Sequence, residues 1–165
     1  METIEILLMA AMVITAISGA ATDVKYRKIF NWLTYPALTV GLVLQLIGYG
    51  WGEMFGQGLS ASLAGAAFCL VVFGAFAYWK RAFGMGDVKL LAALGAQGGF
   101  LPTLHLVMFS AIVGAAMAML WLFFGRGGLL RPDPDLPLPR VPYAVAIALG
   151  TLASLANRLG WITLF

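Results

Sequence analysis

Two aspartates occupy positions where a mostly apolar chain has little reason to keep a charge. Asp23 follows the apolar run 4–22, and Asp87 stands between a glycine-rich turn and the apolar run 88–98. A carboxylate near the centre of a bilayer costs about 3 kcal/mol on insertion scales, and such residues usually face the interior of a helix bundle and mark function. We therefore expect Asp23 and Asp87 to carry the chemistry of this chain.

Two carboxyl groups at one depth can act as a pair that shares a proton. When like charges lie about 3 Å apart, only one of them ionises readily, so the two titrations separate. The ionised carboxylate can then take a proton from water, while the protonated carboxyl polarises a carbonyl group. Such a pair hydrolyses a peptide bond without a metal ion or a covalent intermediate.

The glycines beside Asp87 fit the same chemistry. Gly84 and Gly86 flank Met85 and free the backbone to adopt positive φ or to let another chain come close. A peptide must be extended to be cut, and its exposed backbone groups need hydrogen-bond partners within a membrane. We expect Gly84 and Gly86 to shape the site and to contact substrate.

Each aspartate also has a structural interpretation. Asp87 could cap its helix by placing a carboxylate on the free N–H groups at the positive end of the helix dipole. Asp23 could instead form ion pairs in water with Lys25, Arg27 or Lys28.

Other catalytic machinery is scarce in the sequence. No HExxH zinc motif is present, and Ser18 lies in AISG instead of the GxSG of a rhomboid-type serine site. A single cysteine, Cys69, excludes an internal disulfide and a cysteine-rich zinc module. We expect neither metal nor cofactor. We expect the only histidine, His105, to be a hydrogen-bonded packing residue, with a role in proton relay as the alternative.

The composition predicts the elements that must position these residues. The 165-residue chain is 62% hydrophobic and only 10% charged, whereas soluble domains average about 25% charged residues. A bilayer span needs about 20 mostly apolar residues. We therefore predict an all-α membrane protein in one domain, 1–165, a bundle of about six transmembrane helices with a short fourth helix, at 4–22, 34–50, 59–79, 88–98, 101–124 and 142–160.

Charge predicts the orientation of these helices. Nine of the ten basic residues fall in alternate connections, which the positive-inside rule assigns to the cytoplasm, with both termini outside. Asp23 and Asp87 then share the cytoplasmic boundary of the membrane. Glu2 and Glu5 are assigned to the outer tail of a permanent first helix, and Asp133 and Asp135 to solvated turns of the loop 125–142.

Two segments resemble the paired aspartate signatures of the type IV prepilin peptidases, GxGD-type intramembrane aspartic proteases of the bacterial inner membrane. They are DVKYRKIFN, 23–31, and GMGDVKLLAALGA, 84–96, and the RVPYAVAIALG opening of the last helix is also similar. The resemblance covers nearly the whole chain.

By this resemblance, Asp23 and Asp87 would be the catalytic dyad, and Gly84 and Gly86 would shape the site. Asn31 and Lys89 match motif positions with supporting roles. The family usually has Pro before the asparagine, where this chain has Phe30, so the loop entering the second helix is expected to be less constrained.

A second departure concerns methylation. Longer family members carry a cytoplasmic segment with paired cysteines and methylate the new pilin N-terminus, whereas only ten residues here separate Asp23 from the second apolar run at Thr34. The chain resembles the short branch that serves tight-adherence (Flp-type) pili. The resemblance implies a peptidase that cuts prepilins and pseudopilins after a glycine, between a basic leader and an apolar helix, without N-methylation.

The implied partners are prepilin substrates, the lipid bilayer and the pilus or secretion assembly machinery, with no nucleic acid. Two other functions stay open: a small proton- or cation-coupled transporter or channel, in which a membrane carboxylate binds the ion, and a non-catalytic scaffold for pilus assembly.

Overall fold

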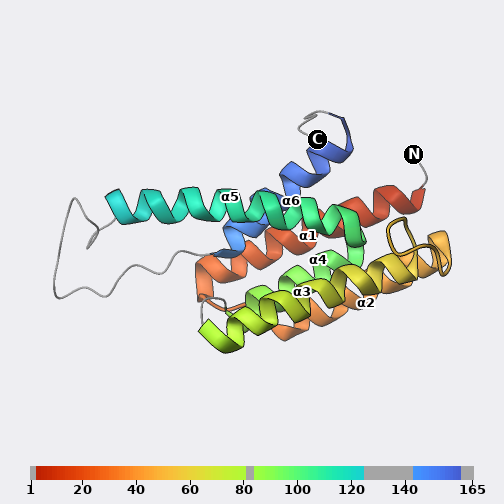
Figure 1. Ribbon diagram of the computed structural model, residues 1–165, viewed down its shortest axis with the longest axis horizontal. Helices are drawn as coiled ribbons and strands as arrows, with labels where there is room; N and C mark the ends of the chain where they lie inside the picture. The colour runs from red at the N-terminus through yellow and green to blue at the C-terminus, as the bar shows by residue number, and fades with distance from the viewer. Residues whose placement is uncertain (1–2, 81–83, 125–142, 161–165) are drawn as a thin grey trace.

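The structure is a computed structural model that describes residues 3–80, 84–124 and 143–160. Asp133 and Asp135 lie outside the described residues. The described part contains six α-helices and no strand (Figure 1), so the prediction of an all-α bundle with a short fourth helix is confirmed. The helices are α1 (Thr3–Tyr26), α2 (Asn31–Tyr49), α3 (Leu59–Lys80), α4 (Met85–Gly98), α5 (Phe100–Phe124) and α6 (Tyr143–Arg158).

The polar ends of α1 and α2 extend beyond the apolar runs. Asp23 lies within the last turns of α1, because this helix continues to Tyr26. The helix ends where Arg27 adopts φ 51° and its N–H donates to the Asp23 carbonyl at 2.7 Å. α2 begins at Asn31, three residues before the expected start. Apolar runs mark the part of a helix within hydrocarbon, while its turns in the interface are polar.

The outer surface of the bundle is suited to lipid. Four helices, α1, α2, α3 and α5, are long and apolar enough to cross a bilayer. Away from their ends these helices expose large aliphatic side chains, namely Ile14, Val43, Val71 and Ile112, and a continuous apolar surface of this kind is unfavourable in water. Exposed aromatic residues gather near the helix ends, as in interfacial belts, at Trp32, Trp51, Tyr78 and Trp79. The chain is therefore a multi-pass membrane protein.

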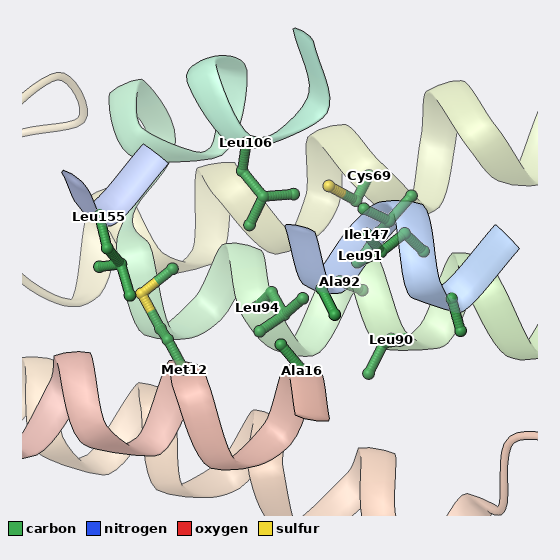
Figure 2. Packing of buried hydrophobic residues seen from close by; sticks show 12 residues of the cluster. Met12, Ala16, Cys69, Leu90, Leu91, Ala92, Leu94, Leu106, Ile147 and Leu155 are labelled. Carbon is green, nitrogen blue, oxygen red and sulfur yellow. The ribbon is translucent and has the colours of Figure 1, made fainter. Parts of the chain in front are cut away.

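The short helix α4 lies at the centre of the bundle. It contacts all five other helices, and every residue from Leu90 to Gly98 is buried (Figure 1). Figure 2 shows its leucines among buried side chains of α1, α5 and α6. The cluster includes Leu90, Leu91 and Leu94 with Met12, Ala16, Leu106 and Ile147.

Glycine allows the backbones of α3 and α4 to touch. A Cβ atom on Gly65 would lie 2.6 Å from the Gly95 carbonyl oxygen, and one on Gly95 would lie 2.7 Å from the Gly65 oxygen. Small residues at a helix crossing permit this approach, and van der Waals contact then stabilises the pair within a membrane.

Two buried glutamines fix the carboxyl end of α4. Gln97 Nε2 donates to Thr15 Oγ1 of α1 at 3.1 Å and to the Ala37 carbonyl of α2 at 2.9 Å. Gln45 Nε2 donates to the Gln97 carbonyl at 3.1 Å, while Gln45 Oε1 accepts the Gly58 N–H at 2.9 Å. These bonds hold one end of α4 while Asp87 lies in its opposite, first turn.

An ion pair joins α1 to α6 at the end of the bundle remote from Asp23. Arg158 Nη2 donates to Glu5 Oε1 at 2.8 Å, and both side chains are largely buried. Glu5 thus lies in the first turn of α1 instead of an outer tail. Arg158 is the one basic residue outside the three basic connections, and its charge is neutralised by Glu5.

Two glycines of α3 provide a matched test of the helix crossing. Gly65→Ala should lower the free energy of unfolding by about 1–3 kcal/mol, because the methyl group meets the Gly95 carbonyl. Gly74 has no neighbouring atom within 4 Å of a Cβ, so Gly74→Ala should be neutral or stabilising by up to about 1 kcal/mol through helix propensity. Thermal unfolding in one detergent would compare them, and equal shifts would contradict the described crossing.

Candidate active site

Asp23 and Asp87 line one cavity of about 490 Å³. They reach it from the last turns of α1 and the first turn of α4, although 64 positions separate them along the chain. The remaining residues singled out from the sequence, Asn31, Gly84, Gly86 and Lys89, line the same cavity. The fold thus brings all six predicted site residues together at one end of the bundle.

Asp87 folds back over Gly84. Gly84 precedes α4 in an extended conformation, φ −69° and ψ 138°, and its carbonyl accepts the Val88 N–H at 3.3 Å. A Cβ on Gly84 would lie 3.0 Å from Asp87 Oδ2, so glycine gives the carboxyl group room there. The carboxyl also receives a hydrogen bond from the Gly84 backbone, as in a capping box. Asp87 therefore caps α4 and lines the cavity at once.

Asp23 does not form the ion pairs that its surroundings suggest. Within the residues that the structure describes, no salt bridge joins it to Lys25, Arg27 or Lys28. Arg27 and Lys28 are exposed at the cavity. The Asp23 side chain is partly buried, on the side of α1 that faces Asp87.

The two acids interact electrostatically. Burial of the Asp87 carboxyl and, second, the negative charge of Asp23 raise the pKa of Asp87 to about 6, while the hydrogen bond from Gly84 opposes this shift. A carboxyl group with such a pKa keeps its proton at pH values where an ordinary aspartate has lost it. Asp87 can thus carry a proton while it lines the same cavity as a second carboxyl group.

Tyr143 is a neighbour of the site that the sequence analysis missed. It opens α6 and lies close enough to Asp87 for the two groups to interact electrostatically. Its ring packs on α5, where a Cβ on Gly114 would lie 2.6 Å from Tyr143 Cε2. The only signal in the sequence was its place in the RVPYAVAIALG segment.

Gly86 lets the α1–α2 connection rest on α4. A Cβ on Gly86 would lie 3.0 Å from the Cβ of Ile29. The chain that approaches this glycine is therefore the protein's own loop, which leads from the Asp23 helix to α2. Its close contact with the first turn of α4 helps to fix the positions of the two acids.

Lys89 joins α4 to the start of α2. Its Nζ donates to Asn31 Oδ1 at 2.9 Å and lies 5.3 Å from the centroid of the Tyr35 ring, a cation–π distance. Lys89 and Asn31 thus connect the two helix ends that border the cavity. Within the described ranges, no three His, Cys, Asp or Glu residues are grouped as metal ligands.

Comparison with known proteins identifies the family of this chain. Residues 10–119 match the profile of the type IV leader peptidase family. Because the match covers more than half of the chain, the protein belongs to this family.

The chain is similar to curated proteins named prepilin leader peptidase/N-methyltransferase. It is 33% identical to that of Xanthomonas campestris pv. campestris over 162 residues, 92% of this chain and 46% of the relative. It is 32% identical to the protein of Aeromonas hydrophila over 162 residues, which are 94% of this chain and 49% of the relative. It is 32% identical to the protein of Pectobacterium carotovorum subsp. carotovorum over 140 residues, which are 84% of this chain and 46% of the relative. The chain thus spans about half the length of these relatives, and no solved structure matches it significantly.

The free energy of unfolding should depend on pH, because folding buries the charge of Asp87. Its pKa is raised by folding, so the folded protein loses stability as pH rises from the ordinary aspartate pKa through about 6. Asp87→Asn removes the charge and should raise the free energy of unfolding by about 2 kcal/mol at pH 8, with no gain at pH 4. Thermal unfolding of the purified protein in detergent at both pH values would measure this.

Glu53→Gln is the matched control, because Glu53 is exposed in the α2–α3 connection. This substitution should leave the melting temperature unchanged at either pH. A loss of stability in Asp87→Asn at pH 8 would contradict a raised pKa for Asp87.

Proposed function

We propose that this member of the type IV leader peptidase family is a membrane aspartic endopeptidase that removes the basic leader from prepilin or pseudopilin precursors. The observation that carries the proposal is the meeting of Asp23 and Asp87 at one cavity of about 490 Å³. The family match and the name borne by the relatives support leader removal as the reaction. They also favour a peptidase over a transporter or a scaffold.

The proposed chemistry divides the work between the two acids. Asp87, whose pKa is raised, keeps a proton and donates a hydrogen bond to the scissile carbonyl, while Asp23 accepts a proton from the attacking water. The water oxygen bonds to the carbonyl carbon, and the Asp87 proton moves to the carbonyl oxygen. When the C–N bond breaks, Asp23 gives its proton to the leaving nitrogen and Asp87 regains its own.

The position of the cavity suits a substrate that is polar on one side of the cut and apolar on the other. Asp23 follows the apolar part of α1, and Trp32, at the start of α2, is exposed at the same level as expected for a residue in the membrane interface. A leader would lie in the headgroup region while the apolar helix of the precursor stays in hydrocarbon. Arg27 and Lys28 would repel a basic leader. We therefore propose that anionic lipid headgroups attract the leader to the membrane surface.

We further propose that leader removal here proceeds without N-methylation. The connection between α1 and α2 contains only residues 27–30, too few for the cysteine-bearing segment expected of longer family members. Cys69, the single cysteine of the sequence, is buried in α3.

Replacing either acid by its amide should abolish cleavage. Asp23→Asn and Asp87→Asn nearly preserve side-chain volume, and loss of one member of a proton-sharing pair should lower the rate of leader removal at least ~100-fold. The assay co-expresses the chain with a candidate prepilin and scores the shortened product by mass spectrometry. Glu53→Gln, an amide substitution at an exposed acid, should cleave at the wild-type rate.

Normal membrane insertion of both variants, checked by extraction and thermal unfolding, would separate chemistry from folding. Cleavage at the wild-type rate by either well-inserted variant would refute the two-acid mechanism.

Methylation should be absent from the product. Purified protein supplied with prepilin and S-adenosylmethionine should release a mature pilin with an unmodified amino terminus, as read from its mass. A methylated terminus made by the purified chain alone would show that the short α1–α2 connection does not exclude methyl transfer.

A further inference from the structure

A second polar cavity lies at the end of the bundle opposite the two aspartates. It has a volume of about 300 Å³ and is bounded by the α2–α3 connection, the first turns of α5 and the last turns of α6. The Glu5–Arg158 pair marks this end of α1, and Arg158 lines the cavity. Asp23 lies eighteen positions after Glu5 in α1, a rise of about 27 Å, so the two cavities face opposite leaflets.

Several polar groups of this cavity lack a partner among the described residues. Gln57 Oε1 is buried without a hydrogen bond, and the side chains of His105 and Asn157 make none within the described part of the chain. The prediction that His105 is hydrogen-bonded is therefore wrong for the described residues. The polar side chains nearby behave differently: Gln45 and Thr103 form hydrogen bonds with backbone groups. Because a buried acceptor without a hydrogen bond lowers stability, Gln57 Oε1 calls for a donor that the described residues do not supply.

Charge restricts what that ligand can be. Arg158 carries five N–H donors and Glu5 two acceptor oxygens, and their ion pair uses one contact of 2.8 Å. Arg158, which lines the cavity, can therefore form further hydrogen bonds there, while the charge of Glu5 cancels its own. A ligand with one negative and one positive group fits this balance better than a simple anion.

The surroundings of the cavity are apolar. Phe55 and Leu101 line it and remain exposed on the outer surface, and Trp51 is exposed on the same connection as Phe55. Exposed tryptophan marks the level of lipid headgroups. The volume is about ten times the share of one water molecule in the liquid, so it admits a headgroup whose acyl chains run along the apolar surface.

We propose that this cavity binds the headgroup of a phospholipid that carries a phosphate and a primary ammonium, the phosphatidylethanolamine class, in the leaflet opposite the aspartate pair. The phosphate accepts hydrogen bonds from Arg158 and Asn157. The ammonium donates to Gln57 Oε1, which satisfies the buried acceptor. The lipid then bridges α5, α6 and the α2–α3 connection.

Titration of the full chain with different lipids tests the proposal. Delipidated protein in detergent is titrated with dioleoyl phosphatidylethanolamine, phosphatidylcholine or phosphatidylglycerol, and bound lipid is counted by native mass spectrometry. Phosphatidylethanolamine should bind at least ~10-fold more tightly than phosphatidylcholine, whose quaternary ammonium has no N–H to donate. The affinity for phosphatidylethanolamine should also exceed the affinity for phosphatidylglycerol, which lacks the positive charge. Equal affinities, or a preference for phosphatidylglycerol, would overturn the proposal.

Substitutions at Gln57 assign the ammonium site. Gln57→Leu should reduce the preference for phosphatidylethanolamine over phosphatidylcholine to near unity, because it removes the acceptor. Gln57→Glu keeps the shape and should retain or increase the preference, so its loss there would refute the assignment even if the leucine variant misfolds. Leu152→Ala, on the part of α6 that faces an apolar groove with α1, is the control and should leave the preference unchanged.

Discussion

The organisation of the bundle depends on the burial of one short helix. At 14 residues α4 rises about 21 Å, less than the ~30 Å hydrocarbon core, and the five other helices surround it. Such burial requires small residues, since the α3 and α4 backbones touch at Gly65 and Gly95. The glutamines at its carboxyl end then determine the depth of α4. In this arrangement the Asp87 carboxyl group is partly buried and still lines a cavity.

The candidate site is assembled from contacts between helix ends. Gly86 accepts the Ile29 side chain of the α1–α2 connection, and Lys89 bonds to Asn31 at the start of α2. Both contacts tie the first turn of α4 to the segment that follows Asp23. The two acids therefore owe their proximity to packing and hydrogen bonds among their neighbours, while their like charges oppose it.

The distribution of apolar and basic residues along the sequence predicted the helices and the membrane boundary at which the two acids lie. It did not predict the side chains that surround the acids. The apolar runs gave six helices, and counting basic residues placed Asp23 and Asp87 at one boundary. The helix ends were less predictable, because polar turns such as 23–26 carry no apolar signal. The Glu5–Arg158 pair, the Gln97 bonds and the closeness of Tyr143 to Asp87 all join residues distant in sequence. Such pairings depend on how helices are arranged around α4, which no single stretch encodes.

The helix α1 carries a candidate catalytic acid, Asp23, near one end and the acid of an ion pair, Glu5, near the other. Because a helix is stiff along its axis, the spacing of about 27 Å between Glu5 and Asp23 is a fixed length set against the thickness of the surrounding lipid. A thicker bilayer would draw one carboxylate toward hydrocarbon or tilt the helix, and a thinner one would expose its apolar turns to water. The protein is thus matched to membranes of a particular hydrophobic width.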